Sequence, residues 1–224
     1  MSPEEQTEVN SVLKEKVSVL QTELKLTHEQ DGLLKPFRDL LGRKARLLQS
    51  GSAQMSPQVT NFLRAAFSCQ IQEGYGLTET CAPCTFTNVK DWELNHVGGP
   101  LTVCELKIAA IPELDYRSSD PNPKGEVLMR GLNISPGYYK NEELTRESFV
   151  NGWFKSGDVG ELLPNGTIRI IDRKKHIFKL AQGIYIAPER LEKAYVKSKY
   201  VSQIFVDGES VETYLVAIVV PDMS

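Results

Sequence analysis

Two short apolar segments flank a predicted helix in the first third of the chain, and this order limits the fold. Ala45–Ser50 and Cys69–Gln72 have the apolar content and length of buried strands. Between them, Ser56–Phe67 begins with a Ser-Pro pair, which is typical of a helix start. A strand–helix–strand order over so few residues predicts two parallel strands joined by a crossover helix.

After Pro100 the sequence changes to short strands separated by turns. Strands are predicted at Leu106–Ile108 and Glu126–Arg130, with a polar loop over residues 111–124 between them. An Asn-Gly turn at residues 165–166 joins two further strands into a hairpin. These features predict a mostly antiparallel β subdomain.

The remaining segments predict helices and a small α+β unit. Apolar residues recur at helical spacing over residues 2–24, and a second short helix is expected over Leu33–Leu41. The first of these indicates a surface helix packed on its own domain, with a partner or membrane helix as the alternative. A helix from Pro188 to about Lys197, followed by strands Val201–Asp207 and Tyr214–Val219, predicts a small α+β unit. The fold class is therefore mixed α/β.

Composition excludes some classes of function. The 224 residues carry a formal net charge of −3, which argues against a general nucleic-acid binder. No apolar run has the length of a bilayer span, so any membrane association is expected to come through other segments. The polar, acidic start differs from a secretory signal, and we expect reduced thiols in a cytosol-facing protein. The four cysteines are Cys69, Cys81, Cys84 and Cys104.

The segment Tyr75–Thr80 combines groups suited to phosphates. Gly76 within it and Gly74 just before it let the backbone approach a ligand closely. Thr78 and Thr80 offer hydroxyl donors, and the carboxylate of Glu79 is the usual kind of Mg²⁺ ligand beside phosphates. Spacing alone does not distinguish a phosphate-binding site from a Gly/Thr-rich turn without a ligand.

Three motifs in order give this sequence a family resemblance. Glu73–Thr80 resembles the adenine- and magnesium-site motif of the adenylate-forming superfamily, and Gly152–Asp158 resembles its ribose-binding motif. Ile171–Gly183 resembles the hinge motif, and Asn151–Pro188 is similar to the signature of long-chain fatty acyl-CoA synthetases. The resemblance covers about Leu33–Asp222.

The resemblance implies a nucleotide pocket built from glycines, a serine and an aromatic ring. Gly51 and Ser52 would line the acyl and adenine pocket. Gly74, Tyr75 and Gly76 would form the platform for adenine, with Tyr75 stacking on the base.

The resemblance also implies roles for charged and hydroxyl side chains. Thr78 would contact the α-phosphate or the acyl carboxylate, and Glu79 would bind Mg²⁺. Asp158 would accept hydrogen bonds from both ribose hydroxyls, and Arg173 would reach the ribose or the phosphate. The resemblance places Lys175 at the hinge position. It implies a catalytic role for Lys175, Thr78 and Glu79.

At the end of the hinge motif, the resemblance places Gly183 beside the pantetheine tunnel. The signature usually has an acidic residue after this glycine, whereas this chain has Ile184. The departure concerns contacts near the thioester tunnel rather than the family itself.

The resemblance divides the chain into three parts. Residues 1–32 are an N-terminal helix with a weak family match, and residues 33–174 are the carboxyl-terminal part of the large adenylate-forming domain. Residues 175–224 are the hinge and the start of a small lid domain. The family's phosphate loop and lid lysine are not found in this sequence, so the resemblance implies a protein truncated at both ends.

The implied reaction is the two-step ligation of a long-chain fatty acid to coenzyme A. The fatty carboxylate attacks ATP to give acyl-AMP and pyrophosphate, and the coenzyme A thiol then releases AMP. ATP, Mg²⁺, coenzyme A and a fatty acid are the expected ligands. The expected location is the cytoplasm or the cytosolic surface of the endoplasmic reticulum, mitochondrial outer membrane or peroxisome. The alternatives are a non-catalytic regulatory protein that binds nucleotide or acyl-CoA, and an adenylating enzyme with another acceptor.

Overall fold

A computed structural model describes residues 28–117, 119–209 and 211–223. The helix expected over residues 2–24 lies outside the described residues. The chain divides into two compact units, one up to Leu101 and one from Thr102, and each is described by itself.

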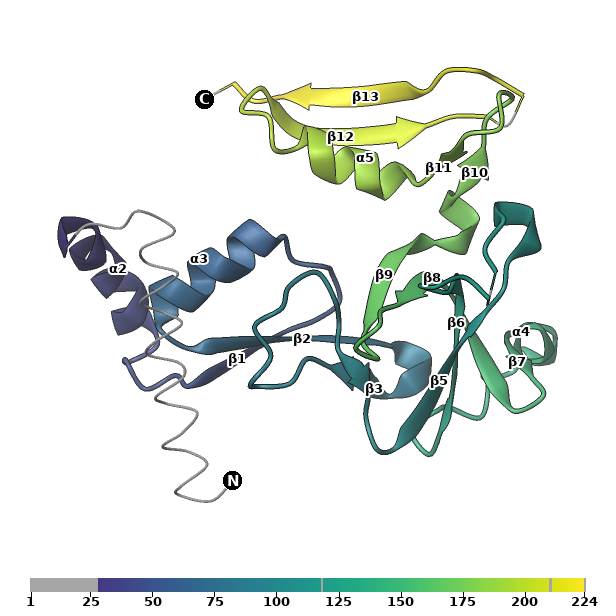
Figure 1. The fold of residues 1–224 in the computed structure, drawn as a ribbon, viewed down its shortest axis with the longest axis horizontal. Coiled ribbons are helices and arrows are strands. Elements are labelled where there is room, and N and C mark those ends of the chain that lie inside the picture. Colours follow the sequence, from purple (N-terminus) through teal and green to yellow (C-terminus); the bar gives the residue numbers. More distant parts are fainter. Residues whose placement is uncertain (1–27, 118, 210, 224) are drawn as a thin grey trace. The chain divides into compact units, whose positions relative to one another are not determined.

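The described part of the first unit is a small mixed sheet with two helices (Figure 1). Its sheet has the order β1-β2-β3-β4, in which β1 and β2 are parallel and the other neighbours are antiparallel. The parallel strand–helix–strand unit is therefore confirmed. The elements are α2 (His28–Leu40), β1 (Leu47–Ser50), α3 (Pro57–Phe67), β2 (Gln70–Leu77), the 3₁₀ turn η1 (Thr78–Thr80), β3 (Ala82–Phe86) and β4 (Gly99–Pro100).

Helix α3 begins and ends as its sequence predicts. The side chain of Ser56 accepts a hydrogen bond from the backbone N–H of Val59, which caps the first turn. Ser68 ends the helix in the left-handed conformation, with φ of 52°. Helix α2 packs against α3 through an edge-on contact of Phe37 with Phe62, whose ring centroids are 5.9 Å apart.

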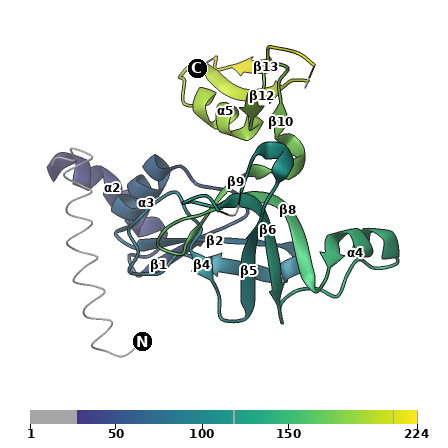
Figure 2. The ribbon, with the colours of Figure 1, turned by 45° about the vertical axis from the view of Figure 1, so that its right-hand side comes forward.

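The second unit begins with an antiparallel sheet (Figure 2). Its order is β5-β6-β8-β7, and β9 pairs with β8. The predicted antiparallel subdomain is therefore confirmed. The elements are β5 (Cys104–Ala109), η2 (Pro112–Leu114), β6 (Lys124–Gly131), α4 (Glu142–Ser148), β7 (Phe149–Val150), β8 (Trp153–Leu162) and β9 (Ile168–Arg173).

The end of the second unit contains one helix and two hairpins. Helix α5 lies against β12 (Figure 1), in agreement with the predicted α+β unit. The elements are η3 (Lys174–His176), β10 (Phe178–Lys179), β11 (Tyr185–Ile186), α5 (Pro188–Tyr195), β12 (Val201–Asp207) and β13 (Val216–Pro221).

The loop between β5 and β6 differs from its expected polar character. Ile111 and Leu114 are buried and pack with Val159 and Ile177 in one core cluster. Two apolar side chains among charged neighbours were too few to give a periodic signal, because their burial depends on strands that lie far away in sequence.

Within the described residues, no helix combines the length and the apolar character needed to span a bilayer.

Candidate functional site

The end of β1 lies beside the middle of β2. Ser50 is the register partner of Glu73, so the turn after β1 begins next to Gly74. A Cβ built on Gly51 would lie 3.7 Å from the carbonyl oxygen of Gly74. The structure thus brings the predicted pocket residues Gly51 and Ser52, at the carboxyl end of β1, close to the predicted adenine platform in the middle of the parallel strand β2.

Strand β2 continues through the segment that was expected to be a turn. It runs to Leu77, and both Gly74 and Gly76 lie close to β3. A Cβ on Gly74 would come within 2.6 Å of Cε1 of Phe86, and one on Gly76 within 2.5 Å of the carbonyl oxygen of Ala82. Close approach of two strands therefore explains both glycines without any ligand.

The 3₁₀ turn η1 presents only part of the predicted phosphate-binding set. Thr80 is fully buried, and its hydroxyl donates to the carbonyl oxygen of Ala82 at 2.6 Å while accepting from the N–H of Leu77 at 2.8 Å. Its hydroxyl therefore closes the turn rather than facing a ligand. Thr78 is exposed and Glu79 is half-buried. These two side chains remain the predicted ligand contacts of the turn.

Glu73 is a buried carboxylate whose role the sequence interpretation missed. Its carboxylate accepts hydrogen bonds from the N–H of Met55 at 3.4 Å and from the hydroxyl of Thr60 at 3.5 Å. Burial raises the pKa of this carboxyl, and the nearby Arg64 guanidinium opposes the shift. The contacts fasten the loop after β1 to β2. The sequence signal was strand alternation, which places Glu73 on the same face as the buried Ile71.

A bulge in β8 sets the position of Asp158. One residue of β6, Val127, faces three residues of β8, at positions 156–158. The hydroxyl of Ser156 donates to the carbonyl oxygen of Val127 at 2.7 Å and accepts from the N–H of Asp158 at 3.0 Å. Gly157 has φ of 71°, which favours glycine. Bulges of this kind redirect a side chain, here a carboxylate.

Asp158 and Arg173, both predicted to contact nucleotide, lie together in the second unit. They are register partners on β8 and β9, and Nε of Arg173 is 2.8 Å from Oδ1 of Asp158. The Asp158 side chain is 5% exposed, whereas that of Arg173 is 45% exposed. The guanidinium thus compensates a buried charge and keeps a solvent-facing side.

The predicted hinge is a single 3₁₀ turn between β9 and β10. Lys175 is exposed at the middle of this turn. Its neighbour Lys174 pairs with the buried carboxylate of Glu126 at 3.0 Å, which gives Lys174 a structural role. Before the turn, burial raises the pKa of the Asp172 carboxyl, which accepts the N–H of Arg173 at 2.7 Å.

Gly183 lies in the tight loop between β10 and β11. Its φ is 89°, and its N–H donates to the carbonyl oxygen of Leu180 at 2.8 Å. The loop conformation accounts for a glycine here. Its placement beside a pantetheine tunnel stays a prediction.

Two other sets of side chains, neither containing Glu79, have ligand atoms within 4.8 Å of one another. In the first set, Nδ1 of His96 accepts the N–H of Gly98 at 3.1 Å. Nε2 of the same ring lies 3.3 Å from Oδ2 of Asp91, so the ring contacts two other residues of its own loop. The sets are Asp91, Glu93 and His96, and Asp172, His176 and Glu189.

Comparison with known proteins decides the family. The model of a family described as "AMP-binding enzyme" matches residues 10–139, more than half of the chain. The chain belongs to the AMP-binding enzyme family. Among the curated proteins, this family member is 50% identical over 183 residues to long-chain-fatty-acid–CoA ligase 6 of Rattus norvegicus. The match covers 81% of the chain and 26% of the rat protein, so the chain spans about a quarter of that relative's length.

A plant relative and a solved structure extend this result. The peroxisomal long chain acyl-CoA synthetase 7 of Arabidopsis thaliana is 48% identical over 188 residues, covering 83% of this chain and 27% of that protein. The adenylation domain of carboxylic acid reductase from Segniliparus rugosus superposes with a TM-score of 0.73 and 35% identity. That match covers 96% of this AMP-binding chain and 34% of the reductase domain, which was solved with AMP and a co-purified carboxylic acid. The fold of the chain is therefore that of adenylate-forming enzymes.

Proposed function

We propose that this chain is part of an AMP-forming long-chain fatty acid–CoA ligase. The observation that carries the proposal is the identity of about half of the aligned residues to long-chain acyl-CoA ligases over 81% of the chain. The proposed reaction joins a fatty acid to coenzyme A through an acyl-adenylate, with ATP consumed and AMP and pyrophosphate released.

In the first step, the fatty carboxylate displaces pyrophosphate from the α-phosphorus of ATP. Adenine would lie on Gly74 and Tyr75, beside Gly51 and Ser52 at the end of β1. The adjacency of these two segments supports this placement. Thr78, exposed on the next turn, would donate to the α-phosphate or the acyl carboxylate.

The carboxylate of Glu79 suits Mg²⁺, because a hard cation prefers oxygen ligands and Glu79 is held on a closed turn beside Thr78. Bound Mg²⁺ would supply neutralisation of negative charge on the phosphates. Glu79 itself would hold the positive charge of Mg²⁺ next to the hydroxyl of Thr78.

The ribose would bind to the ion pair in the second unit. A carboxylate accepts two hydroxyl donors well, and the bulge of β8 together with Arg173 fixes Asp158 in position. Arg173 also has solvent-facing donors for the ribose or phosphate.

In the second step, the thiol of coenzyme A attacks the acyl-adenylate carbonyl and releases AMP. Lys175 would act as the hinge between the proposed large domain, residues 33–174, and the proposed lid, residues 175–224. A single exposed 3₁₀ turn between two short strands supports this role. Gly183 would lie along the coenzyme A path. Residues 1–32 are proposed as an N-terminal part of the chain, although the last five of them already belong to α2.

The proposal includes a place of action in the cytoplasm or on a cytosol-facing membrane surface. The endoplasmic reticulum, mitochondrial outer membrane and peroxisome are the proposed surfaces, reached through segments other than those described. The word "peroxisomal" in the name of the Arabidopsis relative supports an organelle among these.

Titration of the purified chain with AMP tests the nucleotide part of the proposal. We expect saturable binding by calorimetry, weakened about tenfold or more by Asp158→Asn, because a carboxylate bound to a hydroxyl contributes ~1.5–3 kcal/mol. The matched control is Asp120→Asn, at an exposed carboxylate outside the site. Equal affinity of the two variants would contradict the ribose assignment.

A further inference from the structure

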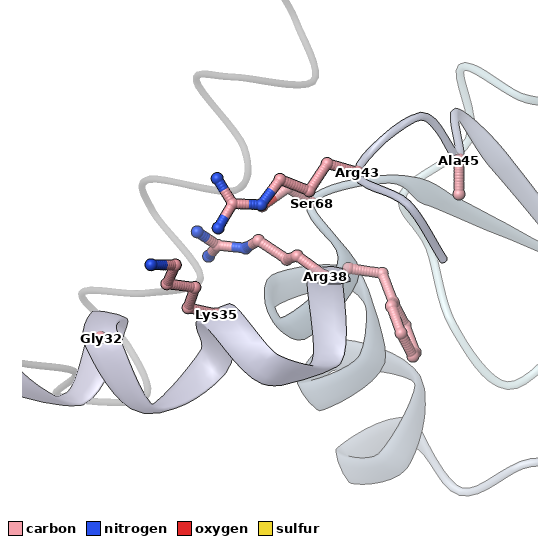
Figure 3. Close-up of a pocket in the computed structure, with 7 residues that line it drawn as sticks. Gly32, Lys35, Arg38, Arg43, Ala45 and Ser68 are labelled. Carbon is pink, nitrogen blue, oxygen red and sulfur yellow. The ribbon is translucent and has the colours of Figure 1, made fainter. Parts of the chain in front are cut away.

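A basic pocket in the first unit lies outside every residue assigned to the ligase reaction. Its volume is about 350 Å³, and α2, the turn after it and the end of α3 form its walls. Figure 3 shows the side chains of Lys35, Arg38 and Arg43 extending toward the same side of α2, with their nitrogen atoms gathered. Gly32, Ala45 and Ser68 add little side-chain bulk to the walls.

The charge of this pocket is one-sided. Among the described residues that line it, three side chains are cationic and none is a carboxylate, and the neighbouring Asp39 pairs with Arg43. The surrounding sequence, residues 35–46, has five basic residues and one acidic residue, whereas the whole chain carries a net charge of −3. Basic groups gathered in this way attract anions by raising their local concentration.

Two of the three cations are held in place by other groups. Nε and Nη2 of Arg38 donate to the carbonyl oxygens of Ala66 and Ala65, at 3.2 and 3.4 Å, at the carboxyl end of α3. Arg43 pairs through Nε with Asp39, which leaves its two terminal nitrogens outside that bond. The Arg43 guanidinium, fixed through Nε, loses less side-chain entropy when its terminal nitrogens bind a ligand.

We propose that this pocket binds a phosphate monoester. A dianionic phosphate suits three converging cations better than a single carboxylate does, and arginine forks match phosphate oxygens in pairs. Ser68, in the left-handed conformation at the end of α3, offers a hydroxyl on the same wall. The volume accommodates a phosphate with the group that carries it. The phosphate belongs either to a small soluble metabolite or to the headgroup of a lipid such as phosphatidic acid.

The test measures binding of inorganic phosphate to the full chain by calorimetry and of vesicles containing phosphatidic acid by sedimentation. Vesicles of phosphatidylcholine alone give the background. The pocket variant is the double substitution K35Q/R43Q, which spares Arg38 because its side chain holds α3. The matched control is R117Q/K197Q, which removes one arginine and one lysine elsewhere. Arg117 pairs with the exposed Asp115 much as Arg43 pairs with Asp39.

We expect the pocket variant to weaken binding about tenfold or more, because charge-assisted hydrogen bonds to phosphate are the strong ones. The control pair should bind like the unchanged chain. Binding of free phosphate without vesicle binding would support a soluble ligand. Tighter vesicle binding that free phosphate reverses would support a headgroup. The proposal is overturned if neither probe binds saturably, or if both double variants lose the same affinity. The single variant K35Q, at an exposed helix position, repeats the test if the double variant unfolds.

Discussion

Substitution of alanine for each glycine around the proposed nucleotide pocket separates packing from ligand binding. A Cβ on Gly76 would meet backbone atoms at 2.5 and 2.6 Å, in Ala82 and Pro83, and backbone cannot move aside cheaply. A Cβ on Gly74 would meet the ring of Phe86 at 2.6 Å, and a side chain can rotate. A Cβ on Gly51 would make only an ordinary contact at 3.7 Å.

These distances give an order of effects on the free energy of unfolding. Overpacking costs ~1–3 kcal/mol, so Gly76→Ala should lie near the top of that range and Gly74→Ala lower. Gly51→Ala should change stability by less than about 1 kcal/mol in either direction, since no positive φ or close contact opposes it. If Gly51 lines the ligand pocket as proposed, Gly51→Ala should nevertheless weaken AMP binding.

Urea denaturation followed by circular dichroism, with an AMP titration of each folded variant, measures both effects. Equal unfolding midpoints for Gly76→Ala and Gly51→Ala would refute the argument that the approach of β3 requires the glycines of β2. Unchanged AMP affinity in Gly51→Ala would refute its place in the pocket.

Three further predictions concern titration, thiol reactivity and the ion pair. Burial raises the pKa of the Glu73 carboxyl above its ordinary 4.5, so the folded state loses stability as the pH rises from that value through the raised pKa. Glu73→Gln should remove this loss. The unfolding midpoint of the variant should therefore rise relative to that of the unchanged chain as the pH goes from acid to neutral. Midpoints that change with pH in the same way for both proteins would contradict this. Burial raises the pKa of the Cys69 thiol to about 11, and Cys81 is the exposed cysteine, so a thiol reagent should label Cys81 rapidly and Cys69 only on unfolding. Mass spectrometry that finds Cys69 labelled first would count against the structure. Arg173→Lys keeps the charge but loses the guanidinium fork, and should weaken AMP binding several-fold; the matched variant Arg169→Lys, paired with Glu161 on the same two strands, should not.

Local signals predicted the elements that depend on nearby residues. Ser56 as the cap of α3 and the parallel pairing of β1 with β2 agree with the structure. The Asn-Gly turn at residues 165–166 also joins β8 to β9 as expected. The cap and the turn depend on residues a few positions apart, and the pairing of β1 with β2 depends on the strand–helix–strand order, which joins Leu47 to Gln70.

The missed features depend on partners distant in sequence or on weak local signals. Strand β2 continues through Gly74 and Gly76 because β3 pairs with it, and glycine has low strand propensity on its own. Strand β3 was not expected, and it contains Pro83, a residue type that is uncommon inside strands. Helix α4 was not expected, although Asn141 caps it and two acidic residues follow in its first turn.

The candidate site was predicted from motifs rather than from geometry. Asp158 and Arg173 were assigned separate contacts, and only the pairing of β8 with β9 shows that they form an ion pair. Thr80 was offered as a ligand donor, but its hydroxyl closes a turn whose shape no local pattern reveals. Glu73 was passed over because a buried carboxylate can be recognised only when its partners are known.

The ligase proposal is tested most directly in a chimera. The aligned segment of rat long-chain-fatty-acid–CoA ligase 6 would be replaced by the matching residues of this chain, and palmitoyl-CoA formation would be measured with ATP and coenzyme A. The account predicts palmitoyl-CoA formation that requires both ATP and coenzyme A. The rate should fall ~100-fold or more in the chimera carrying Glu79→Ala, as expected when a group that stabilises transition-state charge is lost. A folded chimera that forms no palmitoyl-CoA while its parent does, or one indifferent to Glu79→Ala, would contradict it.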